Sequence, residues 1–467
     1  MGMRKEKDSL GEREVPEQAY WGIQTLRASE NFPVSHLKAH PILVRAYIFV
    51  KKACVLANRD LKTVPDDKAE AIITAANEVL EGKLQDQFII DVYQAGAGTS
   101  FNMNVNEVLA NRALEILGKP KGDYETVSPN DHVNRSQSTN DTFPTATHAA
   151  ILLLLPRLTK ALEALINAYA KKAKEFKGVL KSARTHLQDA VPITLGQEFE
   201  AYAVALEEAY AQIESASQGL RSVALGGTAA GTGMNAPSGF KDLAVSYLAN
   251  LTSIKLMPSR DNRYALQSHF PIANFSASLR NLSLELIRLA NDLRLLASGP
   301  LTGLGEIVLP AVQPGSSIMP GKVNPSMAEA MNQIAFDVIG ADQTVALAAQ
   351  AGQLDLNVMT PVAAYRVLHS MEILSNFLPV FAKKGIEGIL AEQERCQVYF
   401  GTSPSLATVL TPKIGYLKSA EIFKEALATK KTVLELVKQK NILSDEEMKQ
   451  LFDPKVLTGE SDSTGNP

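Results

Sequence analysis

Aromatic side chains are scarce in this sequence. They make up 6% of the 467 residues, and Trp21 is the one tryptophan. A core with few aromatic residues must be built mainly from Leu, Ile, Val and Ala, which favours packed helices over a sandwich of aromatic-rich strands. The composition therefore predicts a mainly α protein with a large aliphatic core.

Cysteine and long apolar runs are also scarce. Cys54 and Cys396 lie far apart, and neither belongs to a CxxC motif. This argues against a disulfide framework and a cysteine-rich zinc site, and it predicts a reducing compartment. The longest run of Ile and Leu, residues 151–155, is far too short to cross a bilayer. Residues 3–14 (MRKEKDSLGERE) lack the apolar stretch of a secretory signal. We expect a cytoplasmic protein with no membrane partner.

Neither sign of charge is in large excess, since 47 basic residues face 50 acidic ones for a net charge of −3. No basic stripe runs along the chain, so we expect no nucleic-acid partner. Nucleotide motifs are missing too: there is no Walker-type loop, and the glycine-rich residues 227–233 (GTAAGTG) follow no strand pattern. We expect no metal, nucleotide or redox cofactor.

Long helical patterns fill the middle of the chain. Two stripes recur at alternating steps of three and four: Leu155, Leu158, Leu162, Leu165 and Tyr169, and then Leu279, Leu282, Leu286, Leu289, Leu293 and Leu296. The second segment also carries Leu284, Ile287 and Leu295 away from its stripe. A helix that is apolar on two sides is expected to lie between neighbours, some of them from other subunits.

Further helices are predicted over residues 196–222, 326–350 and 362–390, and shorter ones after residue 395. Together the patterns predict a long helical bundle followed by a small C-terminal domain. Four polar loops lie between the helices, where loops on a rigid scaffold carry functional sites. We number them in chain order: residues 96–100 (GAGTS), 136–141 (SQSTND), 184–188 (RTHLQ) and 314–325 (PGSSIMPGKVNP).

The first two loops are interpreted through backbone chemistry. Gly98 of the first loop allows close approach of a ligand to the backbone, and the three asparagines that follow at every second position must be paired if they are buried. We assign those asparagines a supporting role. Ser138, Thr139 and Asn140 of the second loop are expected at the start of a helix, with Pro144 in its first turn. Such a helix start suits an anion, although a capping cluster explains the same residues.

The third and fourth loops offer side chains of other kinds. His186 is flanked by Thr185 and Gln188, and no other His or carboxylate stands at a metal-ligand spacing from it, so a structural histidine is the alternative to a site residue. In the fourth loop three prolines and two glycines exclude a helix. That loop could close over a ligand, or it could be an ordered connection between two helices.

All four loops resemble blocks of one known family. GSSIMPGKVNP (residues 315–325) resembles the signature loop of the aspartase/fumarase superfamily. Residues 96–108 (GAGTSFNMNVNEV), 136–146 (SQSTNDTFPTA) and 184–198 (RTHLQDAVPITLGQE) are similar to its other blocks, in the same order. The resemblance covers essentially the whole chain. It implies three mostly helical domains (1–139, 140–394 and 395–467) and a homotetramer around a twenty-helix core, in which three subunits build each active site.

The resemblance also implies a reaction on a four-carbon dicarboxylate. A proton is removed next to one carboxylate, an aci-carboxylate forms, and the group on the neighbouring carbon leaves to give fumarate. Ser316 is implied as the base, with backbone N–H groups of the closed loop and Lys322 stabilising its alkoxide. His186, the conventional rival for the base, is implied in an orienting, charge-stabilising role. The implied contacts are Thr99, Ser138, Thr139 and Ser317 at the reacting carboxylate, Lys322, Asn324 and Thr185 at the other carboxylate, and Asn140 and His186 at the amino or hydroxyl group.

Particular positions favour members that release ammonia from L-aspartate. Gly-Thr-Ser at residues 98–100 and Ser-Thr-Asn-Asp at 138–141 are similar to these members, whereas class II fumarases usually have Gly-Thr-Gln and Ser-Ser-Asn-Asp. Residues 326–329 (SMAE) depart from the usual Pro-Glu, which leaves loop closure and fine specificity open. Fumarate hydratase is the nearest alternative. A lyase for an N-substituted aspartate and a non-catalytic, crystallin-like protein are further ones.

Overall fold

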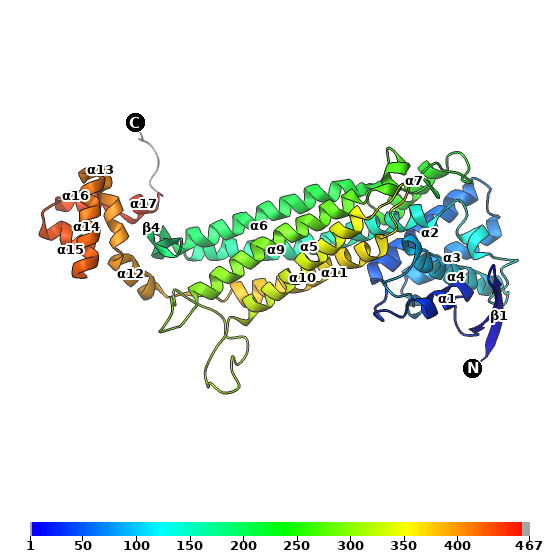
Figure 1. Ribbon diagram of the computed structural model, residues 1–467, viewed down its shortest axis with the longest axis horizontal. Coiled ribbons are helices and arrows are strands. Elements are labelled where there is room, and N and C mark those ends of the chain that lie inside the picture. The colour runs from blue at the N-terminus through cyan, green and yellow to red at the C-terminus, as the bar shows by residue number, and fades with distance from the viewer. Residues whose placement is uncertain (1, 460–467) are drawn as a thin grey trace. The chain divides into compact units, whose positions relative to one another are not determined.

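Long helices dominate the computed structural model, which describes residues 2–459 (Figure 1). The longest are α5 (Thr139–Glu175), α6 (Leu195–Ser217), α9 (Phe270–Leu296), α10 (Ser326–Gln350) and α11 (Thr360–Phe381). Each sheet in the described part of the chain has two strands. The protein is therefore mainly α, which confirms the prediction from its composition. No helix of the described residues has both the length and the apolar character that crossing a membrane requires.

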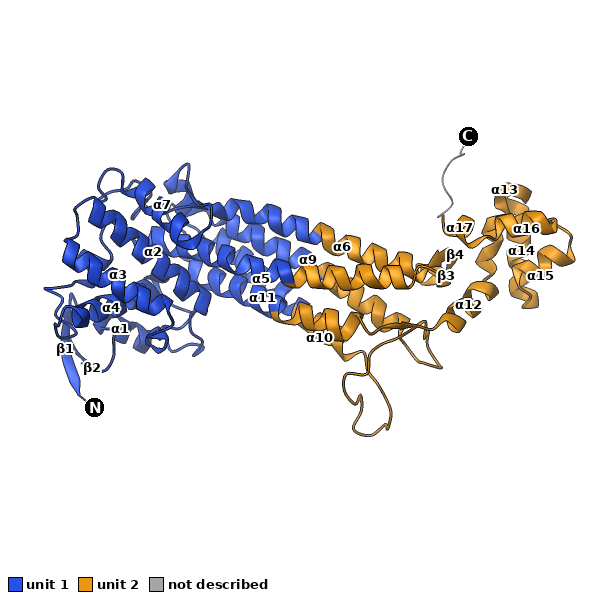
Figure 2. Cartoon of the chain, turned by 180° about the vertical axis from the view of Figure 1, so that it is seen from behind, with its two compact units in different colours: residues 1–160, 209–283, 335–375 blue, residues 161–208, 284–334, 376–467 orange. Residues whose placement is uncertain are grey.

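The chain divides into two compact units (Figure 2). Residues 1–160, 209–283 and 335–375 form unit 1, and residues 161–208, 284–334 and 376–467 form unit 2. Each boundary between the units falls within one of the five long helices, so each of these helices contributes residues to both units.

Unit 1 contains the N-terminal helices and two small sheets. Its hairpin pairs β1 (Met3–Asp8) with β2 (Gly11–Pro16), and β5 (Ser222–Val223) runs parallel to β6 (Met257–Pro258). Its shorter helices are α1 (Ile23–Asn31), α2 (Pro41–Asp60), α3 (Asp66–Leu80), α4 (Thr99–Ile116), α7 (Phe240–Thr252) and α8 (Asn262–Gln267). Its core includes the rings of Tyr47, Phe101 and Phe143, which meet edge to face with centroids 5.3–6.4 Å apart.

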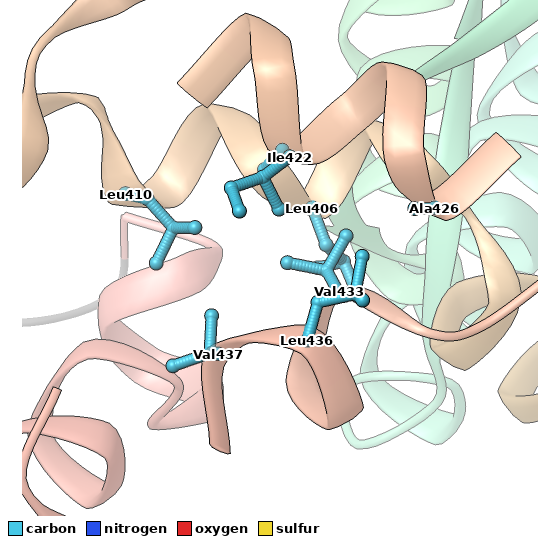
Figure 3. Packing of buried hydrophobic residues seen from close by; sticks show 8 residues of the cluster. Leu406, Leu410, Ile422, Ala426, Val433, Leu436 and Val437 are labelled. Carbon is cyan, nitrogen blue, oxygen red and sulfur yellow. The ribbon is translucent and has the colours of Figure 1, made fainter. Parts of the chain in front are cut away.

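Unit 2 contains two antiparallel pairs and the C-terminal helices. The pairs are β3 (Leu180–Thr185) with β4 (Gln188–Thr194), and β7 (Ile307–Val308) with β8 (Leu390–Ala391). The helices are α12 (Gln393–Thr402), α13 (Thr411–Ile414), α14 (Tyr416–Thr429), α15 (Val433–Gln439), α16 (Asp445–Leu451) and α17 (Pro454–Leu457). The C-terminal helices enclose an aliphatic cluster of their own, in which Leu410, Ile422 and Val437 face one another (Figure 3).

Both predicted leucine stripes are buried, on α5 and α9. The helix predicted over residues 326–350 is α10, whereas those predicted over 196–222 and 362–390 end earlier, at Ser217 and Phe381, and continue as short 3₁₀ and π turns. Of the three residues off the second stripe, Leu284 and Leu295 remain 49% and 41% exposed and Ile287 is half-buried. Pro144 lies in the second turn of α5 rather than in the first, because the helix already begins at Thr139.

Candidate active site

The first loop enters α4 through a backbone that requires glycine. Gly98 has a φ of +98°, and a Cβ atom built on it would lie 2.1 Å from the ring of Phe143. The chain therefore passes directly over a side chain of α5. Thr99 follows as the first residue of α4, with an exposed side chain whose hydroxyl donates to the carbonyl of Gly96. This packing fixes the first loop against the helix that starts at the second.

Ser138 caps α5, as its position in the sequence predicts. Its hydroxyl accepts a hydrogen bond from the N–H of Asn140 at 3.1 Å, and its own N–H donates to Oδ1 of Asp141 at 2.9 Å. The pair resembles a capping box, with aspartate in place of glutamate and with the serine hydroxyl bonded to the second helical residue instead of the third. Thr139 and Asn140 therefore stand in the first turn, where N–H groups without intrahelical partners and the helix dipole favour an anion.

Asp141 fastens the second loop to a glycine-rich segment of unit 1. Its Oδ2 atom accepts hydrogen bonds from the N–H groups of Gly226 at 3.0 Å and Thr228 at 2.9 Å. Burial raises the pKa of the Asp141 carboxyl to about 7 in spite of these donors. The side-chain nitrogen of Asn140 donates to the carbonyl of Ala229 at 2.8 Å. That bond fixes the Asn140 amide and leaves its oxygen for a ligand.

A buried polar network supports the second loop from behind. Nδ2 of Asn102 donates to the Thr139 hydroxyl at 2.9 Å, and the Tyr47 hydroxyl donates to the Asn102 oxygen at 3.1 Å. Nζ of Lys51 donates to Oδ1 of Asn134 at 2.8 Å, and burial lowers the pKa of this amine to about 7. The three asparagines after the first loop are buried, and the amide nitrogen of each donates a hydrogen bond. Asn102 supports the second loop, as expected of these asparagines, whereas Asn104 donates to the carbonyl of Gln87, outside the four loops.

A cleft of about 470 Å³ in unit 1 is lined by Thr99 and Ser100 of the first loop. Arg27 of α1 also lines it and forms an ion pair with Asp8 at 2.9 Å. Ser138, Thr139 and Asn140 do not line this cleft. Within unit 1 the cleft therefore accounts for one of the four predicted site residues.

The third loop is a tight β-hairpin rather than an irregular loop. β3 and β4 pair up to Thr185 and Gln188, so His186 and Leu187 alone form the turn. Both have left-handed backbones, with φ of +53° and +59°, and both side chains are exposed. Two-residue hairpin turns of this kind usually contain Asn and Gly because a side chain disfavours the left-handed region. The turn thus presents His186 at the tip of the hairpin at a cost in backbone strain.

A buried ion network holds strand β3. The carboxylate of Glu306, which is fully buried, lies 2.8 Å from Nζ of Lys181 and 2.9 Å from Nη1 of Arg184. Lys181 also pairs with Glu198 at 2.7 Å, and burial raises the pKa of that carboxyl. Two cations thus face two carboxylates, which is the condition for keeping charges in a protein interior.

The fourth loop closes on itself. The N–H of Gly315 donates to the carbonyl of Lys322 at 2.8 Å, and the Asn324 side-chain nitrogen donates to the carbonyl of Gly315. A Cβ atom on residue 315 would lie 2.4 Å from that Lys322 oxygen, so only glycine permits this approach. The Lys322 and Ser317 side chains are exposed, and Asn324 is half-buried.

Ser316 lies inside the closed loop with its hydroxyl oxygen already solvated by the backbone. The oxygen accepts hydrogen bonds from the N–H groups of Ile318 at 3.2 Å and Met319 at 2.9 Å. Two N–H donors favour a negatively charged oxygen over a neutral hydroxyl. The arrangement can therefore support an alkoxide or receive a proton in a polarised environment.

The predicted site residues are distributed over both units. Unit 1 carries Thr99, Ser138, Thr139 and Asn140, and unit 2 carries Thr185, His186, Ser316, Ser317, Lys322 and Asn324. In unit 1 the Gly98–Phe143 contact connects the first two loops. In unit 2, no hydrogen bond between described residues joins the third loop to the fourth.

Two protein-family models match this chain, and the first covers all four sequence blocks. A family model described as lyase matches residues 11–340, and one described as fumarase C C-terminus matches residues 406–459. The chain belongs to the lyase family. The resemblance to the aspartase/fumarase superfamily is thereby confirmed over most of its length.

Relatives of this lyase support the same assignment. The chain is 49% identical to an aspartate ammonia-lyase of Bacillus subtilis over 97% of its own length and 96% of the relative's. A fumarate lyase:delta crystallin from Brucella melitensis bound to cobalt superposes with a TM-score of 0.94 at 49% identity, covering 97% of this chain and 99% of that one. A class II fumarase from Schistosoma mansoni gives a TM-score of 0.93 at 37% identity, with coverage of 97% and 98%.

Sequence reasoning missed several residues that organise this lyase. Lys51, Asn134, Arg184 and Glu306 hold the loops by contacts between distant segments. Arg184 lies in the third predicted loop but was given no role there, and the sequence patterns gave none to the other three residues. Among residues 2–459, no group of three or more His, Cys, Asp or Glu side chains is suited to hold a metal ion.

Proposed function

We propose that the protein is an aspartate ammonia-lyase, which converts L-aspartate reversibly into fumarate and ammonia. The observation that carries the chemistry is the Ser316 hydroxyl, which accepts two backbone N–H groups inside a closed loop. The choice of an amino acid substrate is supported by 49% identity to a relative named aspartate ammonia-lyase, against 37% for the class II fumarase structure.

In the proposed reaction, Ser316 removes the proton from C3 of aspartate, next to the reacting carboxylate. The electron pair of the broken C–H bond moves into that carboxylate and gives an aci-carboxylate with two negative charges. The pair then returns to form the C2–C3 double bond, while the C–N pair leaves with the amino group. Serine is a poor base near neutral pH, so the N–H groups of Ile318 and Met319 are required to stabilise its alkoxide.

Stabilisation of the doubly charged carboxylate is the main demand on the site, and one preorganised donor is worth about 3 kcal/mol. We assign this task to the hydroxyls of Thr99, Ser138, Thr139 and Ser317. The first turn of α5 supports the assignment, because the positive end of the helix dipole lies at Thr139. All these donors belong to the protein, so the mechanism needs no cofactor.

The remaining residues orient the substrate. We assign Lys322, Asn324 and Thr185 to the second carboxylate, and Asn140 and His186 to the amino group. The free oxygen of the Asn140 amide can accept a hydrogen bond from an ammonium group, and its nitrogen is already fixed on Ala229. A site built around that contact leaves polar groups unpaired when a hydroxyl replaces the amine, so discrimination against malate is expected.

We further propose a homotetramer in which three copies of the chain build each site. Apolar side chains off the buried stripes support this: in unit 2, Val204, Leu284 and Leu295 of the long helices are 41–49% exposed. Exposed apolar side chains along helices of this length are typical of surfaces that another copy covers. Residues 1–139, 140–394 and 395–467 are proposed as its three domains, the last supported by its own aliphatic cluster. Two free, buried cysteines are in keeping with a cytoplasmic location.

The activity is tested with L-aspartate and L-malate in parallel, following fumarate by its ultraviolet absorbance. We expect fumarate from L-aspartate and little from L-malate. Fumarate from L-malate alone would make the protein a fumarate hydratase. No fumarate from either substrate would direct the search to N-substituted aspartates or to a non-catalytic role.

The role of the base is tested by Ser316→Ala. We expect kcat to fall about 10²–10⁴-fold, with fumarate binding retained, because general-base catalysis contributes on that scale. Ser326→Ala is a matched control, since the Ser326 hydroxyl is buried close to the loop and has no hydrogen-bond partner among the described residues. Unchanged turnover in Ser316→Ala would rule out this base.

A further inference from the structure

In the β3–β4 hairpin, both residues of one cross-strand pair, Arg184 and Asp189, contact other parts of unit 2. Arg184 and Asp189 face each other one position behind the pair Thr185–Gln188, so together they form the base of the His186–Leu187 turn. A displacement of this base displaces the turn, because only one pair of residues lies between them. The contacts of Arg184 and Asp189 therefore determine where Thr185 and His186 point.

On the β4 side, two buried serines hold Asp189. The Ser403 hydroxyl donates to the Asp189 carboxylate at 3.1 Å, and the Ser405 hydroxyl donates to the Asp189 carbonyl at 2.9 Å. The serines are 3% and 8% exposed, whereas the Asp189 side chain is exposed. Both hydroxyls thus reach out of the interior to a residue of the hairpin.

On the β3 side, Arg184 lies against the same C-terminal segment. Its guanidinium stands 5.4 Å from the centroid of the Tyr399 ring, on α12, and it pairs with buried Glu306. Tyr399, Ser403 and Ser405 lie within seven consecutive residues, so one short stretch of chain contacts both members of the pair. The mechanism proposed above gives no role to this stretch.

The left-handed turn explains why such a support is needed. His186 and Leu187 both adopt positive φ without being glycine or asparagine, and a strained backbone persists only where its surroundings over-determine it. The ion network on β3 holds one strand only. The serine contacts hold the other strand at Asp189.

We propose that Asp189, Ser403 and Ser405 are positioning residues, through which the 399–405 segment sets the orientation of Thr185 and His186 for catalysis. This inference rests on the proposed function, in which Thr185 contacts a substrate carboxylate and His186 faces the amino group. Small misplacements of such groups reduce catalysis strongly, on the order of 10²-fold for about 1 Å.

The experiment compares Asp189→Ala, Asp189→Asn and the double variant Ser403→Ala/Ser405→Ala in the full-length protein. We expect Asp189→Ala and the double variant to lower kcat/KM for L-aspartate about tenfold to a hundredfold. Asp189→Asn retains an acceptor for Ser403 and is expected to stay within about threefold of the parent. Ser419→Ala is the matched control, because it removes a buried C-terminal hydroxyl that donates to the carbonyl of Gly415, the residue just before its own helix.

A second measurement does not depend on catalysis. Hydrogen exchange of peptides from residues 180–194 is expected to accelerate in Asp189→Ala and in the double variant, but not in Ser419→Ala. If the parent protein makes no fumarate, the proposed function fails, and the exchange data alone still decide whether the serines hold the hairpin. Unchanged exchange, parent-like kcat/KM in Asp189→Ala, or equal losses in Ser419→Ala would overturn the inference.

Discussion

The close approach of Gly98 to Phe143 makes two costs of a substitution at residue 98 measurable. One is the strain of a side chain on a left-handed backbone, and the other is its steric clash with the ring. Gly98→Ala introduces a side chain at a φ of +98°, which costs about 1–2 kcal/mol. It also places a Cβ atom 2.1 Å from the ring of Phe143, and such overpacking typically costs a further 1–3 kcal/mol or so. We therefore expect Gly98→Ala to lower the free energy of unfolding by about 2–5 kcal/mol, measured by urea unfolding followed by circular dichroism.

Gly82 provides the matched control for the backbone energy. It has a φ of +99° and no atom within 4 Å of its ideal Cβ position, so Gly82→Ala should show the left-handed cost alone. Phe143→Leu shortens the ring that Gly98→Ala would strike. The double variant Gly98→Ala/Phe143→Leu should therefore be more stable than the sum of the two single changes predicts, by about 1–3 kcal/mol. Additive changes within about 0.5 kcal/mol would refute the steric reasoning.

Three further predictions concern the fourth loop, a buried carboxyl and the subunit interface. Gly315→Ala should lower fumarate formation at least about tenfold, because its Cβ atom would strike the Lys322 carbonyl and open the loop. Gly321→Ala, at a φ of +81° with nothing within 4 Å, carries the backbone cost without the clash and should have a smaller effect; equal effects would contradict this reasoning. Burial raises the pKa of the Glu107 carboxyl from its ordinary value of 4.5 to about 7. The stability that this carboxyl contributes to the fold is therefore fully present below about pH 4.5 and is lost as the pH rises through 7. The melting temperature of the parent minus that of Glu107→Gln should thus be larger at pH 5 than at pH 8.5, and a constant difference would argue against the shift. Leu284→Arg should reduce the assembly to smaller species in sedimentation, whereas Leu427→Arg, an exposed leucine of α14, should not; an intact tetramer in both would mean that Leu284 is not covered.

The long helices could be predicted because their signal is local. A stripe such as Leu279 to Leu296 repeats within one segment, and burying it requires only that some neighbour be apolar. The start of α5 at Ser138 was predictable for the same reason, since its cap is built from residues 138–141. Pro144 was placed one turn too early although the same cap fixes its position, because it comes six residues after Ser138 and a helical turn has about 3.6.

The supports of the site could not be predicted because they join distant segments. Arg184 meets Glu306 across 122 residues, and Asp189 meets Ser405 across 216. No spacing rule connects such pairs before the fold is known. The hairpin itself was missed because His186 and Leu187 are poor turn residues by propensity, and the fold overrides that preference.

The fourth loop has a consequence for how such a protein can change over time. Both backbone hydrogen bonds to the Ser316 oxygen, and the bonds of Gly315 that close the loop, are made between residues 315 and 324. Substitutions elsewhere in the chain can alter which leaving group is recognised without rebuilding the group that takes the proton. The preference for a leaving group can thus change through one part of the sequence, while another part preserves the step that removes the proton.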